Sequence, residues 1–281
     1  MKIALGTVQW GLEYGIANTQ GIPSDEGLKS IFALANKVGI DLFDTAVQYG
    51  EAEKRVGQFS TSEHQIVTKI GNFSTNNGLK QQLENSFKHL QRQNIYGCLF
   101  HDVDELINNT ELWGELLVYK KEGRINKIGY SLYEPQELLD LLEAGLHPDI
   151  VQLPYSILDR KFEPYFDLLK NKGVEIHVRS VFLQGLYFKN PEQLSNKLSI
   201  LKSVLSELQN ICKQNKLDMS QFCLDFIRQN YNIDYAIIGV ESETQLKEVS
   251  QVKNCKLNWD SILETLDSYV IKKELLNPSY W

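Results

Sequence analysis

The feature that most constrains the fold of this chain is a regular alternation of short apolar runs with longer stretches of helical spacing. Eight runs of four to six residues carry β-branched and aromatic side chains, which favours strands over buried helices. These runs are residues 2–6, 40–44, 65–69, 96–101, 127–131, 150–153, 174–179 and 235–239.

Between most of these runs, apolar residues recur three or four positions apart, as on one face of a helix. The helical stretches lie around residues 31–38, 79–90, 112–116, 138–142 and 201–211, and a further stretch around 262–270 follows the last run. Strands that alternate with helices predict a parallel sheet with right-handed crossovers. Eight repeats within 281 residues predict an α/β fold, namely a (β/α)8 TIM barrel, as a single domain over residues 1–281 with an extra C-terminal helix and tail.

Composition narrows the classes of partner. The net charge of −7 disfavours binding to nucleic acid and to acidic membrane surfaces. The four cysteines are scattered, so the sequence predicts neither a zinc site nor a disulfide framework. The N-terminal apolar run is too short for a signal peptide, and no stretch approaches the ~20 apolar residues of a membrane span. We therefore expect a cytoplasmic protein without a metal site whose partner is a small molecule; nothing in the sequence indicates its oligomeric state.

Side chains with complementary chemistry stand at the ends of three consecutive predicted strands. Asp44 ends the second strand, Lys69 the third and His101 the fourth, and Tyr49 follows Asp44 by five residues. Catalytic groups of a barrel collect at the C-terminal ends of its strands, so we expect these side chains to share one site. Lys69 closes an apolar run, and a buried ammonium needs a carboxylate partner such as Asp44. The positive charge would favour the phenolate form of Tyr49.

The Tyr49 hydroxyl can donate a proton to an oxygen that develops negative charge. His101 could share this proton or orient a carbonyl oxygen. This arrangement suits the reduction of an aldehyde or ketone. No side chain supplies a hydride, so a nicotinamide cofactor is implied. Each residue alone also has a structural interpretation: Tyr49 could pack in the core, Asp44 could cap a helix, Lys69 could extend to solvent, and His101 could pair with Asp102.

Four segments together resemble the aldo-keto reductase superfamily. They are Phe43-Asp44-Thr45-Ala46, Tyr49-Gly50 with Glu53, Val67-Thr68-Lys69 and Leu99-Phe100-His101, and the resemblance extends over essentially the whole chain. It implies a (β/α)8 barrel that uses NAD(P)(H) and interconverts carbonyls and alcohols. It also implies that Tyr49 is the general acid, that Asp44 and Lys69 tune it, and that His101 orients the substrate. The opening from Gly6 to Asn18 resembles members linked to bacterial surface-sugar pathways.

The resemblance further implies a set of cofactor-binding residues. They are Gly6, Thr7, Val8, Asp44, Ser131, Gln152, Arg179, Ser180, Phe182, Gln184, Gly239, Val240, Glu241, Ser242 and Gln245. The chain departs from the family pattern in two places, with Leu132 where an asparagine is usual and Arg179 where an aromatic residue often stacks on the nicotinamide. A guanidinium plane can also stack. Glu241 and Gln245 stand where NADP-preferring members place basic residues, so the cofactor is expected to be NADP or NAD.

Trp10 and Tyr14 follow the first strand, where they either pack in the core or line the substrate pocket together with Tyr49 and His101; we assign them to the pocket. Gln9, Glu13 and Gln48 near the same mouth favour a small polar or sugar-like carbonyl. The leading prediction is thus an NAD(P)H-dependent reductase of an aldehyde or ketone. One alternative is a cofactor-binding regulatory protein of the same fold with little turnover. A metal-dependent hydrolase or epimerase would need convergent ligands, for which only His101-Asp102 and His177 are available.

Overall fold

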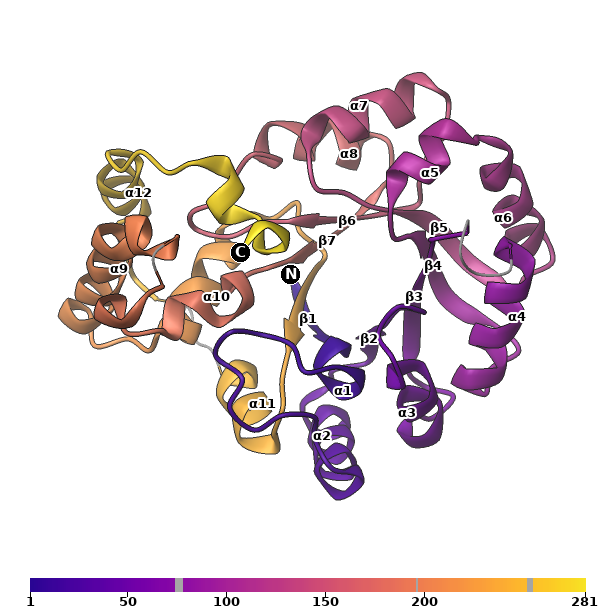
Figure 1. Ribbon diagram of the computed structural model, residues 1–281, viewed down its shortest axis with the longest axis horizontal. Coiled ribbons are helices and arrows are strands. Elements are labelled where there is room, and N and C mark those ends of the chain that lie inside the picture. The colour runs from indigo at the N-terminus through magenta and orange to yellow at the C-terminus, as the bar shows by residue number, and fades with distance from the viewer. Residues whose placement is uncertain (74–77, 196, 252–254) are drawn as a thin grey trace.

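The computed structural model describes residues 1–73, 78–195, 197–251 and 255–281, and within them eight parallel strands close into a barrel. The strands follow one another around the barrel in chain order, and β8 returns to pair with β1. They are β1 (Lys2–Gly6), β2 (Leu42–Asp44), β3 (Gln65–Ile70), β4 (Ile95–Phe100), β5 (Ile125–Ser131), β6 (Ile150–Pro154), β7 (Glu175–Arg179) and β8 (Tyr235–Gly239). The predicted (β/α)8 barrel is therefore confirmed, and Figure 1 shows its strands at the centre of the molecule.

The observed strands agree with the predicted ones to within two residues at each end. β2 begins at Leu42 rather than at residue 40, because the Ile40 amide still donates to the Ala35 carbonyl at the end of the preceding helix, at 2.9 Å. β4 ends at Phe100, which leaves His101 as the first residue of the following loop.

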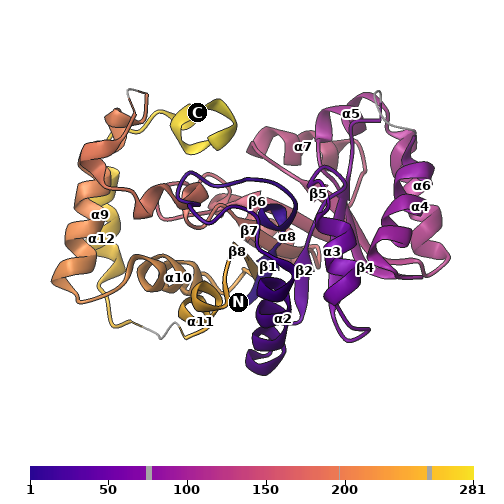
Figure 2. The ribbon, with the colours of Figure 1, turned by 60° about the horizontal axis from the view of Figure 1, so that its bottom comes forward.

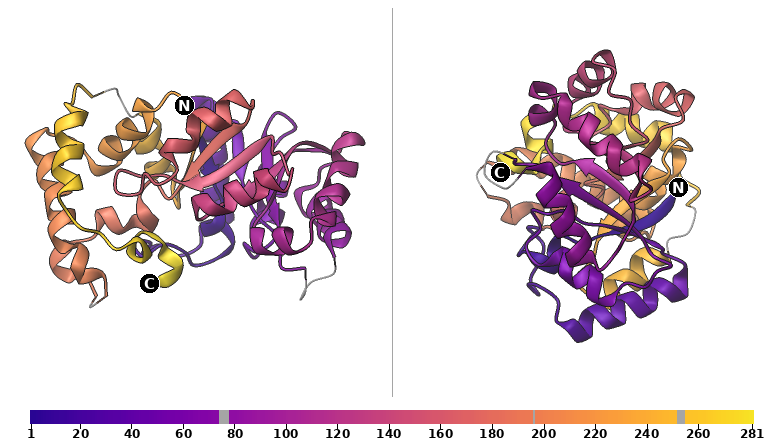
Figure 3. Two further views of the ribbon diagram at one scale, coloured as in Figure 1. Left: turned by 90° about the horizontal axis from the view of Figure 1, so that it is seen from above. Right: turned by 90° about the vertical axis from the view of Figure 1, so that its right-hand side faces the viewer.

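Helices cover the outside of the barrel, as Figures 1 and 3 show. They are α1 (Val8–Gly11), α2 (Asp25–Val38), α3 (Ala52–Phe59), α4 (Leu79–Leu90), α5 (Val103–Asn108), α6 (Glu111–Lys121), α7 (Pro135–Glu143), α8 (Phe166–Asn171), α9 (Lys202–Gln214), α10 (Met219–Gln229), α11 (Glu243–Ser250) and α12 (Trp259–Asp267). Short 3₁₀ segments are η1 (Glu163–Tyr165), η2 (Leu183–Phe188), η3 (Pro191–Gln193), η4 (Leu198–Leu201), η5 (Lys273–Leu276) and η6 (Pro278–Tyr280). No helix in the described part of the chain is long and apolar enough to cross a membrane.

The helices form for different reasons. Ser24 caps α2 by accepting from the Gly27 amide at 3.1 Å, and Gly39 ends the helix in the left-handed conformation at φ 74°. α10, by contrast, was missed by the sequence analysis. Its apolar residues Met219, Phe222, Cys223, Phe226 and Ile227 recur three or four positions apart, as on one face of a helix, so the sequence carries the signal for this helix.

Successive side chains of a strand point to opposite faces, so alternate residues fill the barrel. The apolar part of this interior is Ala4, Leu42, Val67, Leu99, Ile150, Tyr235 and Ile237. On β7 the residues Glu175, His177 and Arg179 share one face, with Arg179 at the carboxyl end of the strand and Glu175 at the other end. The barrel therefore has polar side chains at both ends of an apolar middle.

The amino-terminal end of the barrel is closed by a cluster around Glu175. Its carboxylate accepts from the Tyr96 hydroxyl at 2.8 Å, lies 2.6 Å from the His177 Nε2 atom and pairs with Lys127. His177 is fully buried, so it belongs to this closed end and not to the opposite rim. Although burial opposes ionisation, the hydrogen bonds from His177 and Lys127 lower the pKa of Glu175 to about 2.

The predicted C-terminal helix is present as α12, on the same side of the molecule as α9 and α10 in Figures 1 and 2. Trp259 on α12 stacks on Phe222 of α10, with ring centroids 5.2 Å apart. The tail then folds back on itself, and the Trp281 indole donates to the Leu275 carbonyl at 3.1 Å. The C-terminal segment thus packs on the barrel helices as an ordered addition to the eight-fold repeat.

Candidate active site

The barrel brings the four predicted catalytic residues together at the carboxyl ends of β2, β3 and β4. The Lys69 Nζ atom lies 2.6 Å from Asp44 Oδ2 and 3.5 Å from the Tyr49 hydroxyl oxygen. It also donates to the Thr45 carbonyl at 3.0 Å. The Tyr49 and His101 rings meet edge to face, with centroids 5.5 Å apart. A proton donor, a cation and an imidazole therefore share one small region of the rim.

Asp44 and Lys69 form a buried ion pair. Their side chains are 4% and 1% exposed, which excludes the alternative that Lys69 extends to solvent. Burial lowers the pKa of Lys69, and the adjacent Asp44 carboxylate opposes this shift. The second Asp44 oxygen accepts from the Gln152 amide nitrogen at 2.7 Å, so β6 holds the carboxylate from the other side.

The surroundings of Tyr49 favour its neutral phenol, contrary to the phenolate character expected from the sequence. Burial, followed by the charge of Asp44, raises the pKa of Tyr49 well above its usual value. The expectation was wrong because it considered the positive charge of Lys69 but not the burial of the phenol, which raises the pKa of Tyr49. A neutral phenol is the form that can donate a proton.

His101 is neutral at physiological pH. Burial, then the positive charges of Lys69 and Arg179, lowers the pKa of His101 to about 3. Its Nδ1 atom has no hydrogen-bond partner among the described residues. The alternative pairing with Asp102 is wrong, because the Asp102 carboxylate caps α5 by accepting from the Asp104 amide at 3.0 Å.

A single pocket extends from this group along the rim to β8 and α11. Most residues that the sequence analysis assigned to the cofactor line it: Gly6, Thr7, Val8, Asp44, Ser131, Gln152, Arg179, Ser180, Phe182, Gln184, Gly239, Val240, Glu241 and Gln245. Of the expected substrate-pocket residues, Tyr14, Tyr49 and His101 line the same pocket. Gln9 also lines it, whereas Glu13 and Gln48 are not among the lining residues.

Two predicted site residues lie outside the lining. Trp10 is fully buried, and its indole donates to the Val240 carbonyl at 3.0 Å while its ring packs against Phe32. Trp10 therefore packs in the core beneath the loop that follows β1, and the assignment of Trp10 to the pocket is wrong. The Ser242 hydroxyl instead caps α11 by accepting from the Gln245 amide at 3.3 Å.

Several lining residues were not identified from the sequence. They include Ala17, Phe188, Ser220, Ile237 and Val249. Phe188 and Ser220 come from η2 and α10, in the long segment after β7 that carries no motif. Ile237 and Val249 belong to regular elements, whose apolar side chains give no signal that distinguishes a pocket wall from a core.

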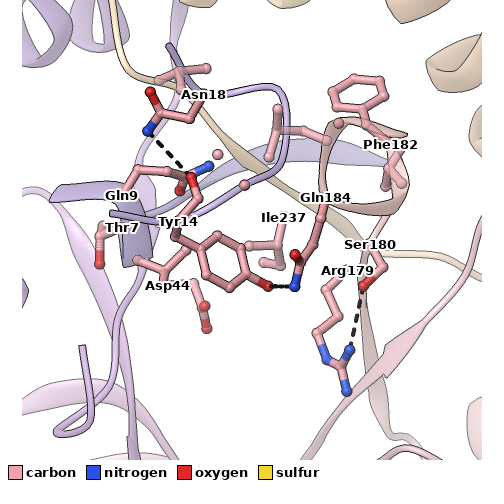
Figure 4. Close-up of a pocket in the computed structure, with 18 of the residues that line it drawn as sticks. Thr7, Gln9, Tyr14, Asn18, Asp44, Arg179, Ser180, Phe182, Gln184 and Ile237 are labelled. Atoms are coloured by element: carbon pink, nitrogen blue, oxygen red, sulfur yellow. Dashed lines mark hydrogen bonds between the residues drawn. The ribbon is translucent and has the colours of Figure 1, made fainter. Parts of the chain in front are cut away.

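Two loops meet across the pocket. Figure 4 shows Tyr14, from the loop after α1, pointing to Gln184, and the Gln184 amide donates to the Tyr14 hydroxyl at 2.6 Å. The Gln184 carbonyl also accepts from the Ile16 amide at 3.1 Å. Gly185, at φ 87°, allows this approach, since a Cβ atom there would lie 2.6 Å from that of Ala17. The loops after β1 and β7 thus form one continuous wall.

The pocket has open hydrogen-bonding capacity of the kind that a nucleotide cofactor would use. The buried Thr7 Oγ1 and Gln9 Oε1 atoms lack partners among the described residues. Gly239 lets the Gln9 side chain pack against the end of β8, because a Cβ atom there would lie 2.2 Å from the Gln9 amide nitrogen. The first turn of α11 follows, and helix N-termini favour phosphate. Within the described ranges no three His, Cys, Asp or Glu residues are grouped to hold a metal ion.

Comparisons with known proteins agree with this geometry. The sequence profile of the Aldo/keto reductase family matches residues 2–269. L-galactose dehydrogenase of Arabidopsis thaliana is 22% identical, with 82% of this chain and 80% of the relative aligned. The NADH-specific methylglyoxal reductase of Escherichia coli K12 is 23% identical over 92% of this chain and 91% of its own length.

Solved structures share the fold. The holo form of the aldo-keto reductase AKR11C1 from Bacillus halodurans superposes with a TM-score of 0.76 at 21% identity. The superposition covers 98% of this chain and 95% of that protein. The similarity therefore includes the C-terminal segment as well as the barrel.

Proposed function

The chain belongs to the aldo/keto reductase family and is an NAD(P)-dependent reductase, and on this basis we propose that it reduces a small polar or sugar-like carbonyl with Tyr49 as the general acid. The observation that carries the proposal is the position of a half-buried phenol beside a lysine and an imidazole at the wall of the pocket. The cofactor is NADP or NAD, and it would be held along the rim from Ser131 and Gln152 to Gly239 and Glu241.

Each residue of the site has its own role in the proposed reaction. The reduced nicotinamide, when bound, supplies the hydride that adds to the carbonyl carbon. The Tyr49 O–H bond then breaks as its proton passes to the carbonyl oxygen, which becomes the alcohol. The negative charge left on Tyr49 is offset by the Lys69 ammonium 3.5 Å away, which Asp44 keeps charged. His101 offers a neutral N–H to the same oxygen and so orients the substrate.

The polar part of the lining supports a hydroxylated substrate. Gln9 lines the pocket from the first loop, and its Oε1 atom has no partner among the described residues, so its amide can bind a hydroxyl. One relative is named for its action on L-galactose and another for methylglyoxal, which are both small oxygenated carbonyl or sugar compounds. We therefore place short aldehydes and aldoses ahead of bulky apolar ketones.

Substitution of Tyr49 tests the proposal. Tyr49→Phe should lower kcat for aldehyde reduction by roughly 10²- to 10⁴-fold, because the positioned proton is lost, while the Kd of the reduced cofactor stays nearly constant. Turnover is followed by cofactor absorbance with methylglyoxal, glyceraldehyde and a panel of aldoses, and Kd by cofactor fluorescence.

Tyr130→Phe is the matched control. It removes a phenol that is fully buried on the outer side of β5, where it contacts the Leu146 carbonyl, and it should leave turnover unchanged. Equal turnover by wild type and Tyr49→Phe would exclude Tyr49 as the acid. Tight cofactor binding with no turnover across the panel would favour a regulatory protein of the same fold.

A further inference from the structure

Glu53 is a buried carboxylate that takes no part in the site described above. It lies in the first turn of α3, shortly after Tyr49 in the chain, and only 3% of the residue is exposed. Glu53 is not among the residues that line the pocket. An apolar side chain would occupy this place at a lower cost, because a buried carboxylate loses its hydration. Stability alone therefore does not explain a carboxylate at this position.

Two polar groups from neighbouring elements meet this carboxylate. The Thr68 hydroxyl of β3 donates to Glu53 Oε1 at 2.6 Å, which is within the range of short charge-assisted hydrogen bonds. The His89 Nδ1 atom, in the last turn of α4, lies 3.5 Å from Glu53 Oε2. Figure 1 shows α3 next to β3 on the outside of the barrel. Glu53 therefore connects α3 both to a strand of the barrel and to the next helix.

The strand that Glu53 contacts is the one that carries Lys69. Side chains alternate along β3, so Val67 and Lys69 face the interior of the barrel while Thr68 faces α3. The Lys69 Nζ atom lies 3.5 Å from the Tyr49 hydroxyl oxygen. Because Thr68 and Lys69 are neighbours in the chain, the hydrogen bond from Thr68 to Glu53 fixes α3 relative to the backbone that places the ammonium.

Tyr49 is coupled to the same helix through its backbone. The Ala52 amide, at the start of α3, donates to the Tyr49 carbonyl at 3.1 Å. The end of α1 also packs directly on this turn. A Cβ atom on Gly11 would lie 1.8 Å from the Tyr49 carbonyl oxygen, and a Cβ atom on Gly50 would lie 2.5 Å from the Gly11 carbonyl oxygen. With so little free space around the turn, a displacement of α3 would move the phenol relative to the ammonium.

We propose that Glu53 is a positioning residue, which sets the separation of Tyr49 and Lys69 by binding α3 to β3 through Thr68. This inference rests on the proposed role of Tyr49 as the general acid, and it adds a residue that contacts neither substrate nor cofactor. A short, directional hydrogen bond limits how far the helix can slide along the strand, whereas apolar contacts allow such movement. A misplacement of about 1 Å can lower a reaction rate by about 10²-fold, so small movements of α3 matter.

A carboxylate that only stabilised the fold would give different results. Replacement of both partners of a buried hydrogen bond by apolar groups of the same shape can leave stability almost unchanged. If Glu53 serves stability alone, such a replacement restores activity together with stability. If Glu53 positions Tyr49, activity stays low in a protein that is stably folded.

Three variants separate the two roles, with kcat and KM measured for methylglyoxal and stability measured by urea unfolding. Glu53→Ala should lower kcat by roughly 10- to 100-fold, while KM and the cofactor Kd stay within a few-fold of wild type. Glu53→Gln keeps an acceptor for the Thr68 hydroxyl and should retain most of kcat. Glu53→Met combined with Thr68→Val should unfold at nearly the same urea concentration as wild type and still have the low kcat.

Glu175→Ala is the matched control. It removes a mostly buried carboxylate at the amino-terminal end of the barrel, so it should lower stability and leave kcat unchanged. An equal loss of kcat in Glu175→Ala would attribute the effect of Glu53→Ala to general destabilisation and overturn the inference. Recovery of kcat in the double variant, or a loss in Glu53→Gln as large as in Glu53→Ala, would overturn it as well.

An NMR measurement reports the position of the phenol without turnover. The Tyr49 Cζ resonance, in protein made with isotope-labelled tyrosine and assigned with Tyr49→Phe, should shift in Glu53→Ala and in the double variant. It should keep its wild-type position in Glu53→Gln and in Glu175→Ala. An unchanged resonance in Glu53→Ala would refute the positioning role. The expected shifts in a protein that reduces no carbonyl would support the positioning of Tyr49 by Glu53 while refuting the proposed reaction.

Discussion

His101 links the chemistry of the site to the stability of the fold. Its pKa lies at about 3 in the folded protein and near 6.5 in the unfolded chain, so only the unfolded chain takes up a proton on this residue between these values. The contribution of His101 to stability is therefore complete above pH 6.5 and is lost as the pH falls toward 3. The cause is burial beside Lys69 and Arg179, both of which oppose a third positive charge.

We expect His101→Asn to reduce the acid sensitivity of the protein. Between pH 7 and pH 5 the wild type should lose about 1 to 2 kcal/mol more of its unfolding free energy than the variant, a range that allows for partial water access from the pocket. Urea unfolding at the two pH values measures this difference. A parallel loss in wild type and variant would show that His101 is not held neutral by its surroundings.

Individual residues also show what sequence could and could not predict about the site. Asp44, Lys69 and His101 were found because each ends a predicted strand, and in a barrel a position at or next to a strand's carboxyl end places a residue at one rim. Trp10 was misplaced because it lies in the one-turn helix α1, where strand periodicity gives no information about direction. Its position depends on packing against Phe32 and on the Val240 carbonyl, more than 200 residues away along the chain.

At the scale of elements, the junction of β8 with α11 determines the charge at the far end of the pocket. The Gln245 side chain accepts from the Glu241 amide at 2.7 Å, which fixes the turn before the helix. Glu241 and Glu248 line the pocket here, whereas its one described lysine or arginine, Arg179, is on β7. A nucleotide bound with its reacting ring near Tyr49 would extend toward these carboxylates, so an additional 2′-phosphate would meet negative charge.

We therefore expect NADH to bind at least about ten-fold more tightly than NADPH, the effect of one unfavourable charge contact. Glu241→Lys should reverse or abolish this preference, and cofactor fluorescence titrations provide both Kd values. Glu243→Lys makes the same charge change on an exposed residue of α11 outside the lining, and it should leave the ratio nearly unchanged. Tighter binding of NADPH by wild type would refute this assignment of the acidic end.

Elements were predictable where a simple apolar pattern marks them. The strands were found as short, nearly continuous apolar runs, and the amphipathic helix α2 was found by its helical spacing, with Ser24 and Gly39 at its ends. α10 was missed although its apolar residues also recur at helical spacing, so this helix was within reach of the sequence. The contact between Tyr14 and Gln184 was out of reach, since two irregular segments 170 residues apart meet only after the barrel closes.

At the scale of the whole molecule, the two ends of the barrel differ in their role: one forms the pocket and the other contributes to stability. The carboxyl ends of the strands carry the pocket, and the opposite end carries the Glu175 cluster with Tyr96, Lys127 and His177. The Glu175 side chain is 12% exposed, so water competes little for its hydrogen bonds. Its pKa of about 2 lies below the usual value of a glutamate, so the cluster stabilises the fold above that usual value and loses the effect as the pH falls toward 2.

Glu175→Gln should consequently lower the unfolding free energy at pH 7 by about 2 to 3 kcal/mol, and the difference from wild type should shrink by about half near pH 3. Glu84→Gln provides the comparison, because Glu84 pairs with Arg124 on the outer surface and its loss should cost less than about 1 kcal/mol. Urea unfolding across this pH range measures both variants. The distance of Glu175 from the pocket also predicts that the folded variant retains the wild-type cofactor Kd, whereas a changed Kd would mean that the two ends of the barrel are coupled.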